Sequence, residues 1–266
     1  MKIGFIGTGN MGGALARAAA KGGHTLLLAN RTPAKAAALA KELGGTVCPN
    51  AEAAEKAELL FLGVKPQGLP GLAGELAPVL QARKGNAPVV VSMATAVTLR
   101  ELDAMLGGGL PLIRIMPNTP AAVGAGTILY AAQNVTDAQL NAFRAVLAQA
   151  GLLLPLPEAQ IDAASAISGC GPAFCFQFAD ALALGGVRAG LSYPDACRLA
   201  AQTMLGAAEM LLQGGEAPDV LKMRVCSPAG TTIEGVLALE QGGFSYTVQN
   251  AVTAAYRRTV EMTRKG

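Results

Sequence analysis

The residues best suited to chemistry lie in segment 225–235, VCSPAGTTIEG. Its Ser-Pro-Ala-Gly run predicts a turn, and the residues that follow it begin a helix. Thr231 and Glu234 have the spacing of a capping box, so we expect Thr231 to be the N-cap. A helix start exposes backbone N–H groups at the positive end of the helix dipole, which suits a carboxylate. The segment therefore predicts a binding site for a small carboxylate.

The first residues carry a second candidate site, a glycine-rich loop for a dinucleotide. Residues 7–12, GTGNMG, match GxGxxG directly after a strand-like run and before a helical pattern. In this pattern Gly7 permits a tight turn, Gly9 lets the backbone approach the pyrophosphate, and Gly12 lets helix and strand pack closely. A turn that merely needs glycines is the alternative. The candidate cofactor-binding residues of the loop are Gly7, Thr8, Gly9, Asn10, Met11 and Gly12.

The end of the second expected strand bears on the choice of cofactor. An NAD site commonly has Asp or Glu there, which accepts a hydrogen bond from the ribose 2′-hydroxyl. This chain has Asn30, Arg31 and Thr32 instead. Arg31 between two hydrogen-bonding neighbours suits a 2′-phosphate, so we expect NADPH, with NADH as the second cofactor to consider. The alternative for Arg31 is a solvated loop charge.

Later strand ends contribute more candidates, because ligands of open α/β sheets bind at the carboxyl ends of strands. Lys65 follows one such strand and could donate to cofactor oxygens, or it is a surface lysine beside a turn proline. Asn118 lies between the two prolines of MPNTP, which hold its polar side chain in a rigid loop near the expected nicotinamide. The other cofactor candidates are Asn50, Val64, Pro66, Met93, Ala94, Thr95 and Pro117.

Short apolar runs alternate with helical patterns through residues 1–157. This rhythm predicts an α/β domain with a mostly parallel, doubly wound sheet and helices on both faces. Thr98 and Glu101 predict a capping box at one helix start. We expect strands at 2–6, 25–29, 59–64, 88–92, 112–115, 127–131 and 152–156, and helices at 10–21, 33–43, 67–80, 98–106 and 136–149.

Residues 158–266 have a different character, with Ala/Leu-rich segments of helical spacing and no convincing alternation. They predict an all-helical second domain. Glycine and proline signals predict its breaks at 185–186, 190–194, 214–218, 227–230 and 242–243. This half is apolar and weakly charged, so we expect its helices to be buried against another chain.

Composition narrows the function classes. The chain has 266 residues, is 52% hydrophobic and 15% charged, and has a net charge of +3, so we expect neither disorder nor nucleic-acid binding. We expect no signal peptide, and the opening apolar run is too short for a membrane span. The five cysteines lack close metal-binding spacing. They predict reduced thiols, no metal and a cytoplasmic protein.

Three motifs, in this order after GFIGTGNMG, carry a resemblance that covers essentially the whole chain. They are MPNTP at 116–120, ISGCGPAF at 167–174 and SPAGTTI at 227–233. In these motifs the chain resembles pyrroline-5-carboxylate reductase, the last enzyme of proline synthesis. The family usually has Ser at the position of Cys170, often Tyr at Phe174 and usually Gly at Ala229. Ala229 restricts a backbone position that normally tolerates positive φ, which bears on the fine geometry of the turn.

The resemblance implies an N-terminal Rossmann domain (1–157) and a C-terminal helical dimerisation domain (158–266). It implies reduction of Δ1-pyrroline-5-carboxylate to L-proline with NADPH or NADH, in a homodimer that often assembles into rings of five dimers. It also implies that the turn from Ser227 to Thr232 holds the substrate carboxylate, with backbone donors from Gly230 and Thr231. Thr232 matches the threonine near the ring nitrogen and is our catalytic candidate. Glu158 loosely matches a glutamate near the substrate, and we count Asn118 among the substrate-binding residues.

Two alternatives stay open on the residues alone. A β-hydroxyacid dehydrogenase needs a catalytic lysine in the helical domain, but residues 151–266 contain only Lys222 and Lys265, neither placed after a glycine motif. Another imine reductase belongs to the same class of rival. A nucleotide-sensing protein without catalysis would keep GxGxxG, but it has no reason to keep both the Asn118 loop and the Thr231 helix start.

Overall fold

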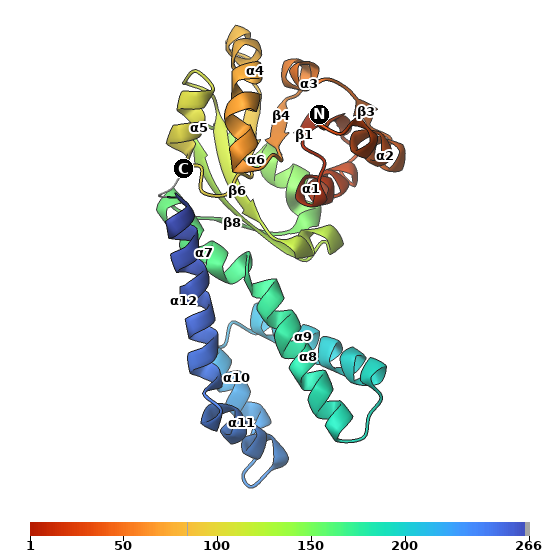
Figure 1. Cartoon of the computed structure of the whole chain (residues 1–266), viewed down its shortest axis with the longest axis vertical. Helices are drawn as coiled ribbons and strands as arrows, with labels where there is room; N and C mark the ends of the chain where they lie inside the picture. Colours follow the sequence, from red (N-terminus) through yellow and green to blue (C-terminus); the bar gives the residue numbers. More distant parts are fainter. Residues whose placement is uncertain (84, 264–266) are drawn as a thin grey trace. The chain divides into compact units, whose positions relative to one another are not determined.

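The computed structural model describes residues 1–83 and 85–263 and contains two compact units (Figure 1). Of the described residues, the first unit comprises 1–83, 85–170 and 256–263, and the second comprises 171–255. The expected domain boundary at residue 158 is the start of helix α7 (Glu158–Ser168), which packs on strands of the first unit. The division at 157/158 stays a prediction about how the chain is organised.

The first unit is built on an eight-stranded sheet with the order β3-β2-β1-β4-β5-β6-β7-β8. All neighbouring strands are parallel except β6 and β7, which are antiparallel. The order reverses beside β1, and in open α/β sheets this switch point places a ligand crevice at the carboxyl ends of the strands. The strands are β1 (Lys2–Ile6), β2 (Thr25–Ala29), β3 (Thr46–Val47), β4 (Leu59–Leu62), β5 (Val89–Ser92), β6 (Leu112–Pro117), β7 (Gly126–Gln133) and β8 (Gly151–Pro155).

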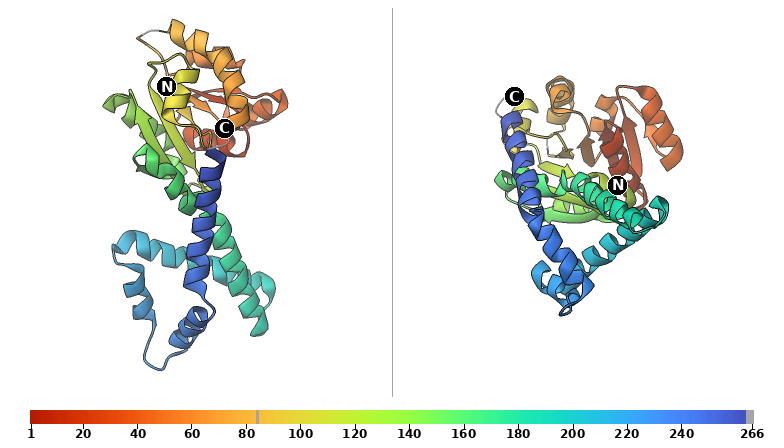
Figure 2. Two further views of the ribbon diagram at one scale, coloured as in Figure 1. Left: turned by 60° about the vertical axis from the view of Figure 1, so that its left-hand side comes forward. Right: turned by 60° about the horizontal axis from the view of Figure 1, so that its bottom comes forward.

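Helices cover both faces of this sheet, as the sequence predicted (Figures 1 and 2). One buried cluster holds side chains of α1, α2 and α6, and the other holds side chains of α3, α4, α5 and α7. The central strand β4 is buried on both faces, and all four of its residues are apolar. Besides α7, the helices are α1 (Asn10–Ala20), α2 (Pro33–Leu43), α3 (Asn50–Lys56), α4 (Leu69–Ala82), α5 (Leu99–Met105) and α6 (Asp137–Leu147), with 3₁₀ turns η1 (Pro66–Gly68), η2 (Thr119–Val123) and η3 (Ala148–Ala150).

The expected capping box at the start of α5 is confirmed. Thr98 Oγ1 accepts from the Glu101 amide at 3.2 Å, and Glu101 Oε2 accepts from the Thr98 amide at 2.7 Å. The Glu101 carboxylate accepts from the Thr98 amide and from the Thr98 hydroxyl, and these two bonds lower the pKa of Glu101. The sequence missed β3 and α3, because a two-residue strand and a seven-residue helix are too short to show a period.

The second unit is entirely helical, with α8 (Gly171–Arg188), α9 (Tyr193–Gly214), α10 (Pro218–Val225), α11 (Thr231–Gln241) and most of α12 (Phe244–Thr263). The expected break at 185–186 is wrong, because α8 continues to Arg188. Gly186 is instead needed for packing, since a Cβ there would lie 3.1 Å from Ala196 Cβ on α9. The other expected breaks fall between helices or at a helix end, where glycine and proline signals are strongest.

Candidate active site

The glycine-rich loop joins β1 to α1 at the switch point of the sheet. Gly7 has φ +97°, and a Cβ there would lie 2.4 Å from the carbonyl oxygen of Gly63. A Cβ on Gly12 would lie 2.0 Å from the carbonyl oxygen of Gly7, so α1 begins against the loop backbone. Both positions therefore require glycine, and Gly63 is a third member of this contact that the sequence did not reveal.

The loop has the features that a dinucleotide needs. Nothing lies within 4 Å of a Cβ built on Gly9, so the backbone can be approached there. Thr8 is buried, and its hydroxyl oxygen has no hydrogen-bond partner among the described residues. Among the described residues no side chain caps the start of α1, which leaves its first N–H groups available to an anion. An orphaned hydroxyl beside an uncapped helix start fits a pyrophosphate.

Asn30 is hydrogen-bonded to the glycine-rich loop. Its Oδ1 accepts from the Thr8 amide at 3.0 Å, and its Nδ2 donates to the Thr32 carbonyl at 3.0 Å. Both ends of the amide therefore have protein partners, and Asn30 joins the end of β2 to the glycine-rich loop. Asn30 and Arg31 also line a pocket of about 470 Å³ together with Cys48, Asn50 and Glu75.

A second pocket, of about 270 Å³, lies at the carboxyl ends of β4, β5 and β6. Its lining is mostly apolar with one lysine, which suits a planar aromatic ring held beside a polar group. It brings together seven sequence-predicted candidates: Met11, Val64, Lys65, Pro66, Met93, Thr95 and Pro117. Gly63 and Met116 also line it and were not predicted.

Ala94 lies in the same segment but has a structural environment. Its side chain is buried, and its amide donates to Ser92 Oγ at 3.3 Å. Two residues further on, Ala96 has φ +62°, a conformation that a non-glycine residue rarely adopts. The loop after β5 is therefore strained directly beside Thr95, which lines the pocket.

Asn118 is buried and hydrogen-bonded within the first unit. Its Nδ2 donates to the Ser168 carbonyl at 2.8 Å, and its Oδ1 accepts from the Thr127 amide at 2.8 Å. It therefore ties the end of β6 to the start of β7 and to the last residue of α7. These bonds give Asn118 a structural role that the sequence did not predict, and its part in substrate binding stays a prediction.

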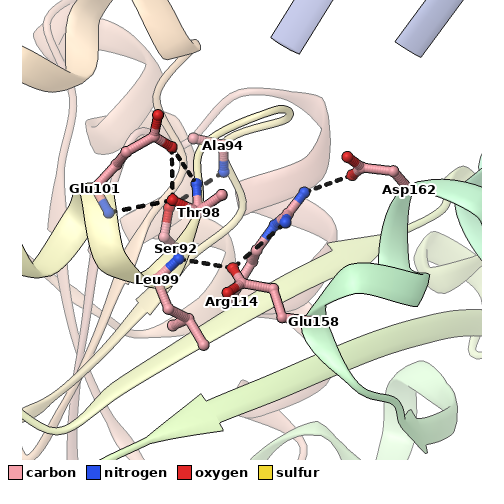
Figure 3. A network of polar contacts seen from close by, with 8 residues as sticks. All are labelled: Ser92, Ala94, Thr98, Leu99, Glu101, Arg114, Glu158 and Asp162. Atoms are coloured by element: carbon pink, nitrogen blue, oxygen red, sulfur yellow. Dashed lines mark hydrogen bonds and ion pairs between the residues drawn. The ribbon is translucent and has the colours of Figure 1, made fainter. Parts of the chain in front are cut away.

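Glu158 belongs to a network of polar contacts around Arg114 (Figure 3). Glu158 Oε1 accepts from the Leu99 amide at the start of α5, at 2.7 Å, and lies 3.4 Å from Arg114 Nη1. Asp162 Oδ1 accepts from Arg114 Nη2 at 2.6 Å. The Arg114 side chain is 4% exposed, so these two carboxylates balance a buried charge. The network was not predicted, and it gives Glu158 a structural role; substrate contact by Glu158 stays a prediction.

The expected carboxylate turn lies in the second unit, between α10 and α11. The expected capping box is wrong, because Gly230 is the N-cap and no side chain in the described part of the chain caps α11. Thr231 is already the first helical residue, so its hydroxyl is not at the capping position. The Gly230 amide donates to the Ser227 carbonyl at 3.0 Å, which closes the turn. This amide therefore has a partner within the turn, and its expected role as a backbone donor to the substrate carboxylate stays a prediction.

The amides of Thr231 and Thr232 remain as donors, because the first N–H groups of a helix have no carbonyl four residues before them within it. Both side chains are exposed. Ala229 has φ +55°, so the turn keeps the left-handed residue even though alanine stands there. An alanine in this conformation is strained where glycine would not be.

The remaining lysines, His24 and the cysteines give no support for lysine catalysis or a metal site. Lys222 is exposed on α10, and Lys265 lies outside the described residues. His24 precedes β2 and so lies at the amino end of that strand, whereas both pockets lie at carboxyl ends. Within residues 1–83 and 85–263 no group of His, Cys, Asp and Glu could hold a metal ion, and the five cysteines are free thiols.

A switch-point glycine loop with an aromatic-sized pocket beside it defines a nicotinamide-nucleotide oxidoreductase. Residues 2–96 match the family "NADP oxidoreductase coenzyme F420-dependent", and residues 158–262 match "Pyrroline-5-carboxylate reductase dimerisation". A pyrroline-5-carboxylate reductase of Pseudomonas aeruginosa is 38% identical across 98% of this chain and 96% of its own length. The chain belongs to the pyrroline-5-carboxylate reductase family.

Solved structures agree with this assignment. A pyrroline-5-carboxylate reductase from Coxiella burnetii has a TM-score of 0.90 and 32% identity, covering 97% of both chains. The pyrroline carboxylate reductase of Plasmodium falciparum with NADP bound has a TM-score of 0.86 and 30% identity, covering 99% of this chain and 98% of that one. The expected fold class of a Rossmann-type domain followed by a helical domain is confirmed.

Proposed function

We propose that this chain reduces Δ1-pyrroline-5-carboxylate to L-proline by hydride transfer from NADPH. The observation that carries the proposal is one chain with both the switch-point cofactor loop and the SPAGTTI helix start, matched along nearly its whole length by reductases of this name. A nucleotide sensor would need only the first of these features.

The bound nicotinamide supplies the hydride, and the residues of the chain do the positioning. Thr8 and the start of α1 bind the pyrophosphate, while Lys65 and Thr95 orient the nicotinamide end in the smaller pocket. In well-oriented systems, holding two reactants in register lowers the barrier by about 7–11 kcal/mol. No strong acid is required for this reaction, since an iminium carbon already accepts hydride.

The second unit binds the substrate. The amides of Thr231 and Thr232 bind its carboxylate at the positive end of α11, and the Thr232 hydroxyl hydrogen-bonds the ring nitrogen. Oriented donors of this kind elsewhere contribute about 3–4 kcal/mol each to transition-state stabilisation. Thr232 is therefore the residue whose removal should affect turnover more than cofactor binding.

The active species is a homodimer at least, with a pentamer of dimers as its further assembly, and it works in the cytoplasm. The proposal is supported by how little of the second unit is buried. Only three residues of 171–255 are buried, and all are alanines (Ala183, Ala196 and Ala200). Large apolar residues stay exposed on every helix of that unit, for example Phe176, Leu212 and Tyr246. A domain without its own core needs a partner surface.

One helical segment, residues 158–188, is long and apolar enough to cross a membrane by length and composition alone. The same segment lies within the match to the dimerisation domain. Its apolar surface is therefore explained by a subunit interface, and no membrane partner is needed.

The test is the rate of NADPH oxidation in the presence of pyrroline-5-carboxylate, with L-proline identified as the product. We expect turnover by the wild-type chain and oligomers in solution by light scattering. Tight NADPH binding without any oxidation would contradict the proposal and favour a sensor.

A further inference from the structure

The pocket at the end of β2 is lined by a carboxylate that comes from a distant part of the sequence. Two residues after β2 the chain has Arg31, which favours a 2′-phosphate. Glu75 lines the same pocket but comes from α4, more than forty residues later. The pocket therefore holds one cation and one anion where the ribose 2′ position of a dinucleotide is expected.

Glu75 is also tied to another residue of the pocket. Asn50, at the start of α3, donates from Nδ2 to Glu75 Oε2 at 3.0 Å. An ionised carboxylate can only accept hydrogen bonds, so the NH₂ end of the Asn50 amide must face Glu75. In the described part of the chain, Asn50 is the only group that donates to Glu75, which leaves the second carboxylate oxygen available to a ligand hydroxyl.

We propose that Glu75 is a specificity-determining residue for the nucleotide. Its carboxylate accepts a hydrogen bond from a ribose 2′-hydroxyl and repels a 2′-phosphate. Arg31, in contrast, attracts the 2′-phosphate. The site consequently accepts both NADH and NADPH, and Glu75 reduces the preference that Arg31 alone would give. This inference rests on the cofactor site of the proposed function.

The expected size of the effect follows from exposure. Glu75 and Arg31 are both exposed, so solvent and salt screen their fields. Exposed charge pairs contribute up to about 1 kcal/mol, which corresponds to roughly a fivefold change in affinity. The 2′-phosphate carries more than one charge, so we expect a change of roughly three- to tenfold.

The test compares two small nucleotides that differ only at the 2′ position, adenosine 5′-monophosphate and adenosine 2′,5′-bisphosphate. Calorimetry on the ligand-free full-length protein gives the ratio of their affinities. Glu75→Gln removes the charge but keeps an acceptor for Asn50. The matched control is Glu55→Gln, which removes an exposed carboxylate from α3 that does not line this pocket.

We expect Glu75→Gln to shift the ratio toward the bisphosphate roughly three- to tenfold, with a smaller shift at high salt. We expect no shift in Glu55→Gln. An unchanged ratio in Glu75→Gln, or equal shifts in both variants, would overturn the inference. Because no substrate is present, a protein that binds both nucleotides but fails to reduce pyrroline-5-carboxylate would contradict the proposed function alone. A wild-type protein that binds neither nucleotide would overturn both.

Discussion

Gly63 offers the sharpest test of how the cofactor site is built. It follows β4 and faces the glycine-rich loop, where a Cβ would lie 2.5 Å from the carbonyl oxygen of Gly7. Ordinary contact begins at 3.4 Å, so an alanine needs a movement of about 0.9 Å. The contacted atom is backbone, and both segments are held in the sheet by the bonds from Gly7 to Ala29 and from Gly63 to Ile6.

Gly63→Ala should therefore destabilise the first unit by about 1–3 kcal/mol, the usual range for overpacking at a site that cannot relax. For a chain of this size that corresponds to a fall in Tm of roughly 3–10 °C. The glycine-rich loop must move to make room, so we also expect NADP⁺ affinity to fall about tenfold or more, because displacements near 1 Å at binding groups have large effects.

The control is the same change where space is open. Gly74 lies inside α4, is exposed, and has nothing within 4 Å of a built Cβ. Gly74→Ala should stabilise the protein by about 0.5–1 kcal/mol and leave NADP⁺ affinity unchanged. Thermal unfolding and titration calorimetry on both variants check this. A Gly63→Ala protein as stable as the wild type with unchanged NADP⁺ affinity would refute the steric argument.

Four other substitutions test separate parts of the structure. Thr232→Ala should lower kcat/KM while NADPH binding stays nearly unchanged; unaltered steady-state kinetics would remove its assigned role. Arg31→Asp should move the cofactor preference toward NADH, and the ratio of kcat/KM for the two cofactors measures this. Arg114→Met should destabilise by about 3 kcal/mol in denaturant titration, since it leaves two partly buried carboxylates without their cation. Ala229→Gly should raise Tm, because it relieves a left-handed alanine that costs about 1–2 kcal/mol; a lower Tm would contradict this.

The sequence predicted helices and strands well where an apolar pattern extends over several residues. The alternation of apolar runs and helical patterns located the strands β1 and β2 and the helix α2 to the residue. The same local logic failed at Thr231, because Gly230 is the N-cap. A capping-box spacing shows that a helix starts nearby, but it does not decide which of two adjacent residues is outside the helix.

Contacts between distant segments were beyond what the sequence could predict. Gly63 and Gly7 approach each other only because β1 and β4 are neighbours in the sheet. Glu75 reaches the pocket at the end of β2 from α4, and Glu158 reaches the start of α5 from α7. No spacing rule connects such pairs, since their separation along the chain is set by the topology of the sheet rather than by a helical or strand period.

Two alanines at positive φ connect stability with the geometry of the proposed site. Ala96 lies in the loop beside the smaller pocket, and Ala229 lies in the turn before α11. Each costs about 1–2 kcal/mol that glycine would avoid. Alanine has fewer accessible backbone conformations than glycine. Where the surrounding structure holds the alanine at positive φ, the loop therefore samples fewer conformations than a loop with glycine would. A loop that must present amides to a carboxylate gains from this restriction, because donors already in place need no ordering when the ligand binds. If the turn before α11 holds the substrate carboxylate as proposed, Ala229→Gly should weaken substrate binding while it raises stability.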